Sequence, residues 1–291
     1  MKPSIALHWD ISAHKDAVGA AQASTAWLKE LPLPWLRKHA HVGAKRKKGE
    51  LVLEVLQFFG VASVETWRRY YETPLAAFRA SPKVGKKVGA VTAWLRLAEL
   101  RATALECQTF DKSRFKHTLS GLRELTNESD PEVFIPELVR ICAAAGVAVV
   151  FVPAPAGCPA SGATRWLSAT KAMLVLSLRH KSNDHLWFTF FHEAAHIVLH
   201  GKKMLFVAGL NGLDEKHEAE ADRFARDLLI PPAAARALAN RSWAKAEVRR
   251  FAAEIEVAPG IVVGRLQKEG RLPWSQMNDL KLYYEWTPSD G

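Results

Sequence analysis

The sequence has little of what marks secreted, membrane-spanning or fibrous proteins. Its 291 residues contain only three cysteines, which are scattered and form no CxxC pair. That pattern argues against a disulfide-stapled secreted domain and favours a reducing compartment. No stretch reaches the roughly 18 apolar residues of a transmembrane helix, and the N-terminus lacks the apolar run of a signal peptide. We therefore expect a cytoplasmic protein that makes no membrane contact.

The overall composition is that of a soluble globular protein. Hydrophobic residues make up 48% of the chain and charged residues 24%, and the chain is long enough to bury a substantial core. We find no internal repeat and no low-complexity tract. The length fits one large domain or two ordinary ones.

The net charge of +10 is unevenly distributed. Residues 1–125 carry 21 Lys and Arg against 11 Asp and Glu, whereas residues 126–291 carry 19 of each. The excess is concentrated in Lys45–Lys48, Arg68–Arg69 and Lys83–Lys87. A basic half suggests an anionic partner, either nucleic acid or an acidic protein. A solvated basic face without a ligand explains it equally well, because no aromatic-interleaved binding motif accompanies the charge.

The first 125 residues read as mainly helical. Apolar spacing and helix-forming residues predict helices over residues 17–28, 50–59, 90–107 and 114–125. The clearest of them, 90–107, is expected to be apolar on one face. We therefore expect a helical, basic N-terminal region over residues 1–125.

The remainder reads as a small α+β unit. A helix is expected to start at Ser129–Glu132, where a capping residue precedes a proline and an acid. The strand 147–152 and a hairpin of 164–167 with 173–177 follow, and then an apolar helix over 186–200. The fold class is thus α+β, with a small α+β unit over residues 126–240 and a helical C-terminal extension, 241–291, packed on it.

The apolar helix contains an HExxH motif, His192-Glu193-Ala194-Ala195-His196. Positions i and i+4 share a helix face, so His192 and His196 can ligate one metal ion. Glu193 is turned by about 100°, which suits it to take a proton from water as a general base. Two histidines that are merely exposed or hydrogen-bonded remain the alternative interpretation.

A catalytic zinc needs a third protein ligand. His200 is a poor candidate because it lies about 12 Å along the helix from His192. We expect it to line the cleft, contact substrate or hydrogen-bond nearby. Glu218, on a second helix, is the better candidate, with Asp222 holding a ligand histidine from its outer side. Glu220 is the second choice, and a solvated acidic face is the alternative.

At these residues the chain resembles the ImmA/IrrE family of zinc metallopeptidases. The likeness lies in Trp187–His200, Glu218–Ala225 and Leu228–Pro231, and it covers roughly residues 130–235. Further segments are similar to a subgroup in which an XRE-type helix-turn-helix precedes the peptidase: Phe58–Ser63, Ala93–Glu99 and Ser161–Leu167. Residues 1–24 are too short for such a DNA-binding domain, so we expect it to be lost or supplied by a separate protein.

The resemblance implies both an activity and a set of residue roles. Relatives cleave a cognate XRE-family repressor in response to stress, DNA damage or phage infection. Carried over, His192, His196 and Glu218 would bind one Zn²⁺, or Mn²⁺, and Glu193 would be the general base. A second donor to the developing oxyanion remains open between His200 and His185. From strand order we expect Met173–Ser177 to be an edge to which an extended substrate adds.

Two other functions remain open. The chain could be a non-catalytic regulator, an antitoxin-like binding module with a structural or idle metal site. A fourth protein ligand would favour that function, and a position left for water would favour the enzyme. A weaker alternative is nucleic-acid contact through the basic N-terminal part, which would show a steep salt dependence.

Overall fold

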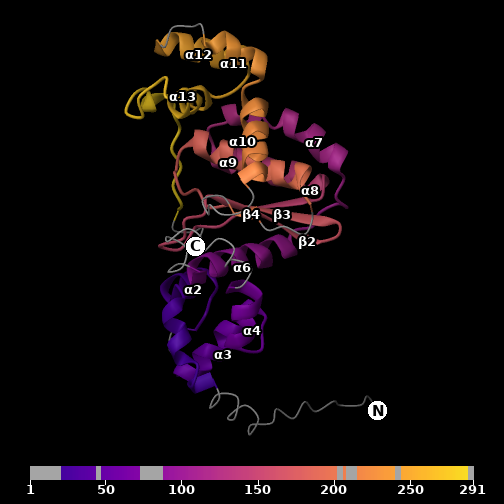
Figure 1. The fold of residues 1–291 in the computed structure, drawn as a ribbon, viewed down its shortest axis with the longest axis vertical. Helices are drawn as coiled ribbons and strands as arrows, with labels where there is room; N and C mark the ends of the chain where they lie inside the picture. Colours follow the sequence, from indigo (N-terminus) through magenta and orange to yellow (C-terminus); the bar gives the residue numbers. More distant parts are fainter. Residues whose placement is uncertain are drawn as a thin grey trace.

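The computed structural model describes residues 21–43, 47–72, 88–201, 206–207, 215–239 and 244–287. Figure 1 shows three zones along the long axis of the molecule: N-terminal helices at one end, a β-sheet in the middle, and the remaining helices beyond it. The fold is α+β and mainly helical, as predicted. Among the described residues, no helix combines the length and apolar character that crossing a membrane would need.

The N-terminal zone consists of short helices around an aromatic core. They are η1 (Thr25–Glu30), α2 (Leu33–His39), α3 (Lys48–Phe59), α4 (Val64–Trp67), η2 (Arg68–Glu72) and α6 (Val88–Ala104). The predicted helix 50–59 is confirmed as α3. It ends at Gly60, whose φ of 70° is the left-handed conformation that glycine adopts without strain.

The predicted helix over residues 17–28 is helical in much of its described part, but its last residues are not α-helical. Residues 17–20 lie outside the described residues, and Thr25–Glu30 forms a 3₁₀ helix rather than an α-helix. Pro32 and Pro34 follow at the start of the next helix, α2, where the missing proline N–H needs no partner within the helix.

The predicted helix 90–107 is confirmed as α6. The expectation of a single apolar face is wrong, because α6 is buried on two sides. Twelve of its 17 residues are buried, because α6 lies between the sheet and the N-terminal helices (Figure 1). Trp94 crosses to the sheet side, where its Nε1 donates to the carbonyl of Val152 at 2.9 Å. A helix covered on two sides loses the polar stripe that a surface helix keeps.

The second group of helices surrounds the HExxH segment. It comprises α7 (Lys112–Gly121), η4 (Glu124–Asn127), α8 (Pro131–Ala144), α9 (Asn183–Leu199), α10 (Glu215–Leu229), α11 (Pro232–Ala239), α12 (Lys245–Glu254), α13 (Pro259–Lys268) and η5 (Asn278–Leu280). The predicted start of α8 is confirmed, since Asp130 Oδ1 accepts from the backbone N–H of Glu132 at 2.9 Å.

The sheet has the strand order β1-β3-β2-β4. Its strands are β1 (Val147–Phe151), β2 (Gly162–Ser168), β3 (Lys171–Leu176) and β4 (Phe206–Val207). The predicted hairpin is confirmed as the antiparallel pair β2–β3, in which Thr164 opposes Leu174.

The expectation that Met173–Ser177 forms an edge is wrong. Strand β3 is central, because β1 pairs with its other side in parallel, with Val149 opposite Leu174. Its backbone donors and acceptors are therefore used on both sides, and no further strand can add there. On the other side of the hairpin, β4 covers β2 only at Ala163 and Thr164.

The sheet separates two hydrophobic cores. Val150 and Val175 belong to the core shared with the N-terminal helices, whereas their neighbours Val149 and Leu174 belong to the core around α9. This is the period-2 alternation of a strand that is covered on both faces. The division into regions at residues 125 and 240 stays a prediction.

The C-terminal helices close against α9. Helices α12 and α13 share the core of α9, and two glycines allow the close approach of α13. A Cβ on Gly260 would lie 2.5 Å from Asn183 Oδ1, and one on Gly264 would lie 2.4 Å from Asp184 Oδ2. The start of α9 is thereby held in place at one end of the site described next.

Candidate metal centre

The two motif histidines lie on the buried side of α9. His192 is 6% exposed and His196 is 2% exposed, because α9 is enclosed between the sheet and α10 (Figure 1). Their Nε2 atoms face each other at 3.1 Å. Burial of two facing imidazole nitrogens requires something positive between them, either a proton or a metal ion.

Helix α10 brings Glu218 to the same point. Its carboxylate oxygens lie 3.3 Å from His192 Nε2 and 3.5 Å from His196 Nε2. Within the described part of the chain, these three residues form the one group whose ligand atoms could hold a metal ion. Zinc bonds nitrogen at about 2.0–2.1 Å, and two ligands of a tetrahedral ion are then about 3.3 Å apart. The observed spacings fit such an ion.

The electrostatics also fit a cation. Burial opposes charge on His192, but hydrogen bonds to Asp222 and Glu218 outweigh it and raise the pKa of this imidazole to about 10. Burial, together with the rings of His192 and His200, lowers the pKa of His196 to about 2. The carboxylates thus favour a single positive charge between the two rings, where a divalent ion would lie.

The outer nitrogens of both histidines are held as well. His192 Nδ1 lies 2.9 Å from Asp222 Oδ1, one helical turn after Glu218. His196 Nδ1 lies 2.8 Å from His200 Nδ1, and His200 Nε2 lies 3.2 Å from Glu220 Oε2. His200 therefore uses both nitrogens behind His196, and so it does not face the metal position.

Glu193 points from α9 toward β2. It is fully buried, and Thr164 Oγ1 lies 2.6 Å from its Oε2. A Cβ on Gly162 would lie 2.9 Å from Glu193 Cγ and 2.6 Å from Thr189 Cγ2. The bare backbone of Gly162 and the hydroxyl of Thr164 together set the position of this carboxylate.

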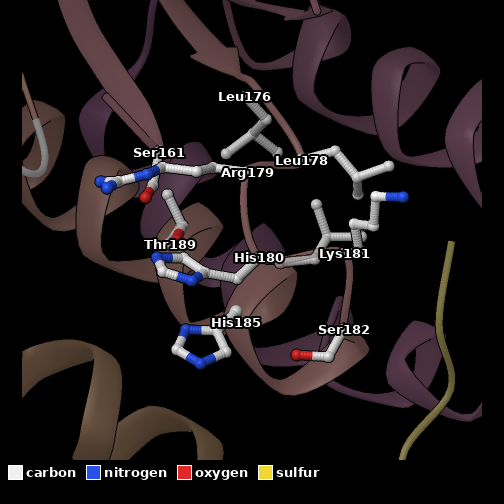
Figure 2. Close-up of a pocket in the computed structure, with 10 residues that line it drawn as sticks. Ser161, Leu176, Leu178, Arg179, His180, Lys181, Ser182, His185 and Thr189 are labelled. Atoms are coloured by element: carbon white, nitrogen blue, oxygen red, sulfur yellow. The ribbon is translucent and has the colours of Figure 1, made fainter. Parts of the chain in front are cut away.

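His185 lies apart from the three-residue cluster. It is on α9, seven residues before His192, and its ring stacks on that of His180 with centroids 4.3 Å apart. Figure 2 shows these two rings together beside Thr189, with the Arg179 side chain extending toward Ser161. Burial lowers the pKa of both imidazoles, which makes them neutral groups at the side of the site.

Sequence reasoning did not identify three contributors to this geometry. Thr164 and Gly162 lie on a strand about 30 residues before Glu193, and nothing in their local pattern links them to it. His217, whose ring centroid is 4.3 Å from that of His200, could have been noticed as a histidine adjacent to Glu218. Its contact depends on how α10 packs against α9.

Comparison with known protein families agrees with this arrangement. Residues 142–267 match the model of the peptidase M78 family, described as an IrrE N-terminal-like domain. Residues 142–267 form an IrrE N-terminal-like domain. The predicted resemblance is therefore confirmed for residues 142–267. No curated protein matches the chain.

The IrrE N-terminal-like domain contains every element of the cluster. It begins near the end of α8 and continues through the sheet, α9 and α10 into α13. Membership supports a metallopeptidase-like domain, and peptidases of this family are typically metal-dependent. The match also continues past residue 240, so it includes α12 and most of α13.

Proposed function

We propose that this protein is a zinc-dependent metalloendopeptidase. The observation that carries the proposal is the convergence of two buried Nε2 atoms and one carboxylate, with spacings that suit a single tetrahedral ion. The Glu218 side chain is 40% exposed, whereas the side chains of His192 and His196 are 7% and 1% exposed. The cluster is thus buried on the α9 side and open on the α10 side, which is where substrate would enter.

The number of ligands favours an enzyme over a structural site. Structural zinc sites are closed by four protein ligands, whereas catalytic sites use three and keep one position for water or substrate. Among the described residues, the cluster provides three. This is the distinction that separates the enzyme from a non-catalytic, antitoxin-like regulator.

Glu193 is the proposed general base. Zinc bound at the cluster would supply a Lewis acid that polarises a peptide carbonyl and acidifies water. Glu193 takes a proton from the attacking water, and the same carboxylic acid then gives that proton to the leaving amine nitrogen as the C–N bond breaks. Thr164 positions the carboxylate for both transfers through its contact with Oε2.

Asp222 and His200 are proposed as positioning residues. Each holds the outer nitrogen of one ligand ring, which fixes the ring orientation and leaves Nε2 available for the metal. Glu220 supports His200 in turn.

We propose an XRE-family repressor, or an antitoxin of that kind, as the substrate. The support is the resemblance to peptidases that act on such repressors. The basic N-terminal half gives the chain a second surface for an anionic partner, although much of Lys45–Lys48 and all of Lys83–Lys87 lie outside the described residues.

The decisive experiment compares the wild type with Glu193→Gln on candidate XRE-type repressors from the same genome. Both proteins should bind one zinc ion per chain by elemental analysis. The wild type should cleave the repressor, and the variant should be slower by roughly 10²–10⁴-fold, the usual contribution of a general base. Mass spectrometry of the products gives the cleaved bond.

A matched control is Glu215→Gln, at the exposed start of α10, which should cleave like the wild type. Cleavage at equal rates by the wild type and Glu193→Gln would refute the catalytic assignment. So would the absence of cleavage by the wild type with zinc and with manganese.

A further inference from the structure

A groove next to the metal cluster has no role in the mechanism above. It has a volume of about 400 Å³ and lies between α9, α10 and α13. Two of its lining residues connect it to the cluster. Asp222 holds His192, and the Phe188 ring centroid lies 6.1 Å from that of His192. The groove therefore starts one helical turn from the metal ligands, and its size is within the range of ligand clefts.

The inner surface of the groove is apolar. Leu229, Ile230 and Ile261 line it and are almost fully buried. Trp274, which the sequence suggests as a packing anchor, lies at the groove with 58% of its surface exposed. A large exposed aromatic at the edge of an apolar groove is typical of a binding surface, because its ring loses water when an apolar group covers it.

The charged residues around the groove differ in how fully they are paired. Its three acids are engaged: Asp184 with Lys281, Asp222 with His192, and Glu269 with Arg265. The cations Arg226 and Lys268 are exposed. Arg226 has one acidic neighbour, Asp227, at 3.4 Å, and that pair is open to solvent and therefore weak.

These features match one kind of occupant. A peptide that places a large apolar side chain on the floor and an acidic side chain near Arg226 and Lys268 would satisfy both the apolar surface and the charge. Arg226 is one turn beyond Asp222 on α10, about 6 Å along the helix. A peptide passing the metal cluster can thus reach the groove within a few residues of the scissile bond.

We propose that this groove binds the substrate segment next to the scissile bond and selects a large apolar residue accompanied by an acidic one. The proposal rests on the proposed peptidase function. It assigns specificity to Trp274, Arg226 and Lys268, which lie outside the metal cluster.

The test uses the zinc-loaded full chain and a library of internally quenched peptides, randomised on both sides of a central bond. The wild type should favour peptides with a large apolar residue and an acidic residue on the same side. In the double variant R226E/K268E the preference should change from acidic to basic residues by about tenfold or more, since like charges now face each other. Trp274→Ala should reduce the apolar preference and leave the acidic one.

The matched control is K112E/K116E, two exposed lysines on α7. It changes the net charge by the same amount and should keep the wild-type preference. A second readout is direct binding of fluorescein-labelled peptides to Glu193→Gln, followed by anisotropy, which requires no turnover. The same reversal of charge preference is expected there.

The outcomes separate this inference from the proposed function. If the wild type cleaves library peptides, but R226E/K268E and the wild type share one preference in both assays, the groove proposal is wrong and the peptidase stands. If the wild type cleaves no peptide and labelled peptides bind without selectivity, both are wrong. Selective binding that reverses in R226E/K268E without any cleavage keeps the groove and rejects the peptidase.

Discussion

Single residues set the position of the carboxylate that the mechanism needs. Glu193 is buried between α9 and β2, and the space for it exists because Gly162 has no side chain. Thr164, two residues along the same strand, contacts Glu193 Oε2 at 2.6 Å. The same strand thus provides both the room for the carboxylate and the hydroxyl that orients it.

At this scale we predict that Gly162→Ala inactivates the enzyme without removing the metal. The new Cβ would lie 2.6 Å from Thr189 Cγ2 and 2.9 Å from Glu193 Cγ, so the carboxylate must move. Peptide cleavage should fall by about 10²-fold, the lower range for loss of a general base. Zinc content measured on the purified protein should stay at one ion per chain.

Gly121→Ala is the control, because a Cβ at Gly121 would meet nothing within 4 Å. Unchanged cleavage by Gly162→Ala would show that the position of Glu193 is not critical for turnover.

Among the elements, the irregular helical segment from α4 into η2 places Tyr71 in the N-terminal core. Ser63 caps α4 through a hydrogen bond from the Thr66 N–H at 3.1 Å, and the helix then widens to a π-helix over Arg68–Glu72. The wider turn directs Tyr71 inward, where its hydroxyl donates to the Phe59 carbonyl at 2.9 Å. Its ring packs edge-on against the Phe59 ring at 5.2 Å.

This contact predicts a loss of stability at high pH. Burial, followed by the charge of Glu99, raises the pKa of Tyr71 to about 12, whereas an unfolded tyrosine titrates near 10. The contribution of Tyr71 is complete below about pH 10 and decreases as pH rises toward 12, because only the unfolded state ionises in that interval. We expect the free energy of unfolding to fall by about 1.4 kcal/mol at pH 11 from this residue.

Urea denaturation at pH 9 and pH 11 measures the effect. Tyr71→Phe should lose less stability between the two values than the wild type. Tyr70→Phe, which changes a ring that is 55% exposed, should lose as much as the wild type. Identical pH dependence in all three proteins would contradict the assignment.

In the whole molecule, the C-terminal segment is bound to the start of α9 by several hydrogen bonds. Leu282 exchanges backbone and side-chain hydrogen bonds with Asn183, and the Tyr284 N–H donates to the Lys181 carbonyl at 2.7 Å. Lys281 Nζ enters the interior, where it lies 2.7 Å from both Asp184 Oδ2 and Gln267 Oε1. Residues almost 100 positions apart thereby hold the start of the helix that carries the candidate metal ligands.

We predict that Lys281→Met destabilises the protein by about 3–5 kcal/mol, since it leaves the buried Asp184 carboxylate without its cation. Thermal and urea unfolding measure the loss. Adding Asp184→Asn should restore much of the stability, because the uncompensated charge is then gone.

The comparison variant is Lys181→Met, which removes a pair with Glu285 whose side chains are 57% and 77% exposed. It should lower the free energy of unfolding far less than Lys281→Met does, because a solvent-exposed ion pair contributes little to stability. Equal losses in the two lysine variants would mean that the buried pair is not what fixes the C-terminal segment.

Much of the local structure could be predicted from the sequence. The segments that became α3, α8 and α9 have apolar residues at helical spacing and recognisable ends at Gly60 and Asp130. The hairpin consists of two strand-forming segments joined by a short turn, so its antiparallel pairing was also predictable. Such features depend on contacts within a few residues, which local propensity and chain geometry largely determine.

The remaining features depend on contacts between distant segments. Strand β3 looked like an edge until β1 was found paired to it in parallel, and α6 looked amphipathic until its two-sided burial was seen. His200 was expected to line the cleft, contact substrate or hydrogen-bond nearby, and its contacts with His196 and Glu220 select the last of these. In each case the outcome depends on a contact with another element. The position of that element follows from tertiary packing and cannot be read from the local sequence pattern.

By itself the sequence determined the spacing of His192, Glu193 and His196, because helix geometry alone places the first and last of these on one face. It also pointed to Glu218 as the acid to join them. Only the tertiary structure decided which way Glu193 faces, what holds each ring, and where the groove begins. Those properties arise where β2, α10 and α13 meet α9, and the free energy of that packing comes from the whole core and not from any one segment.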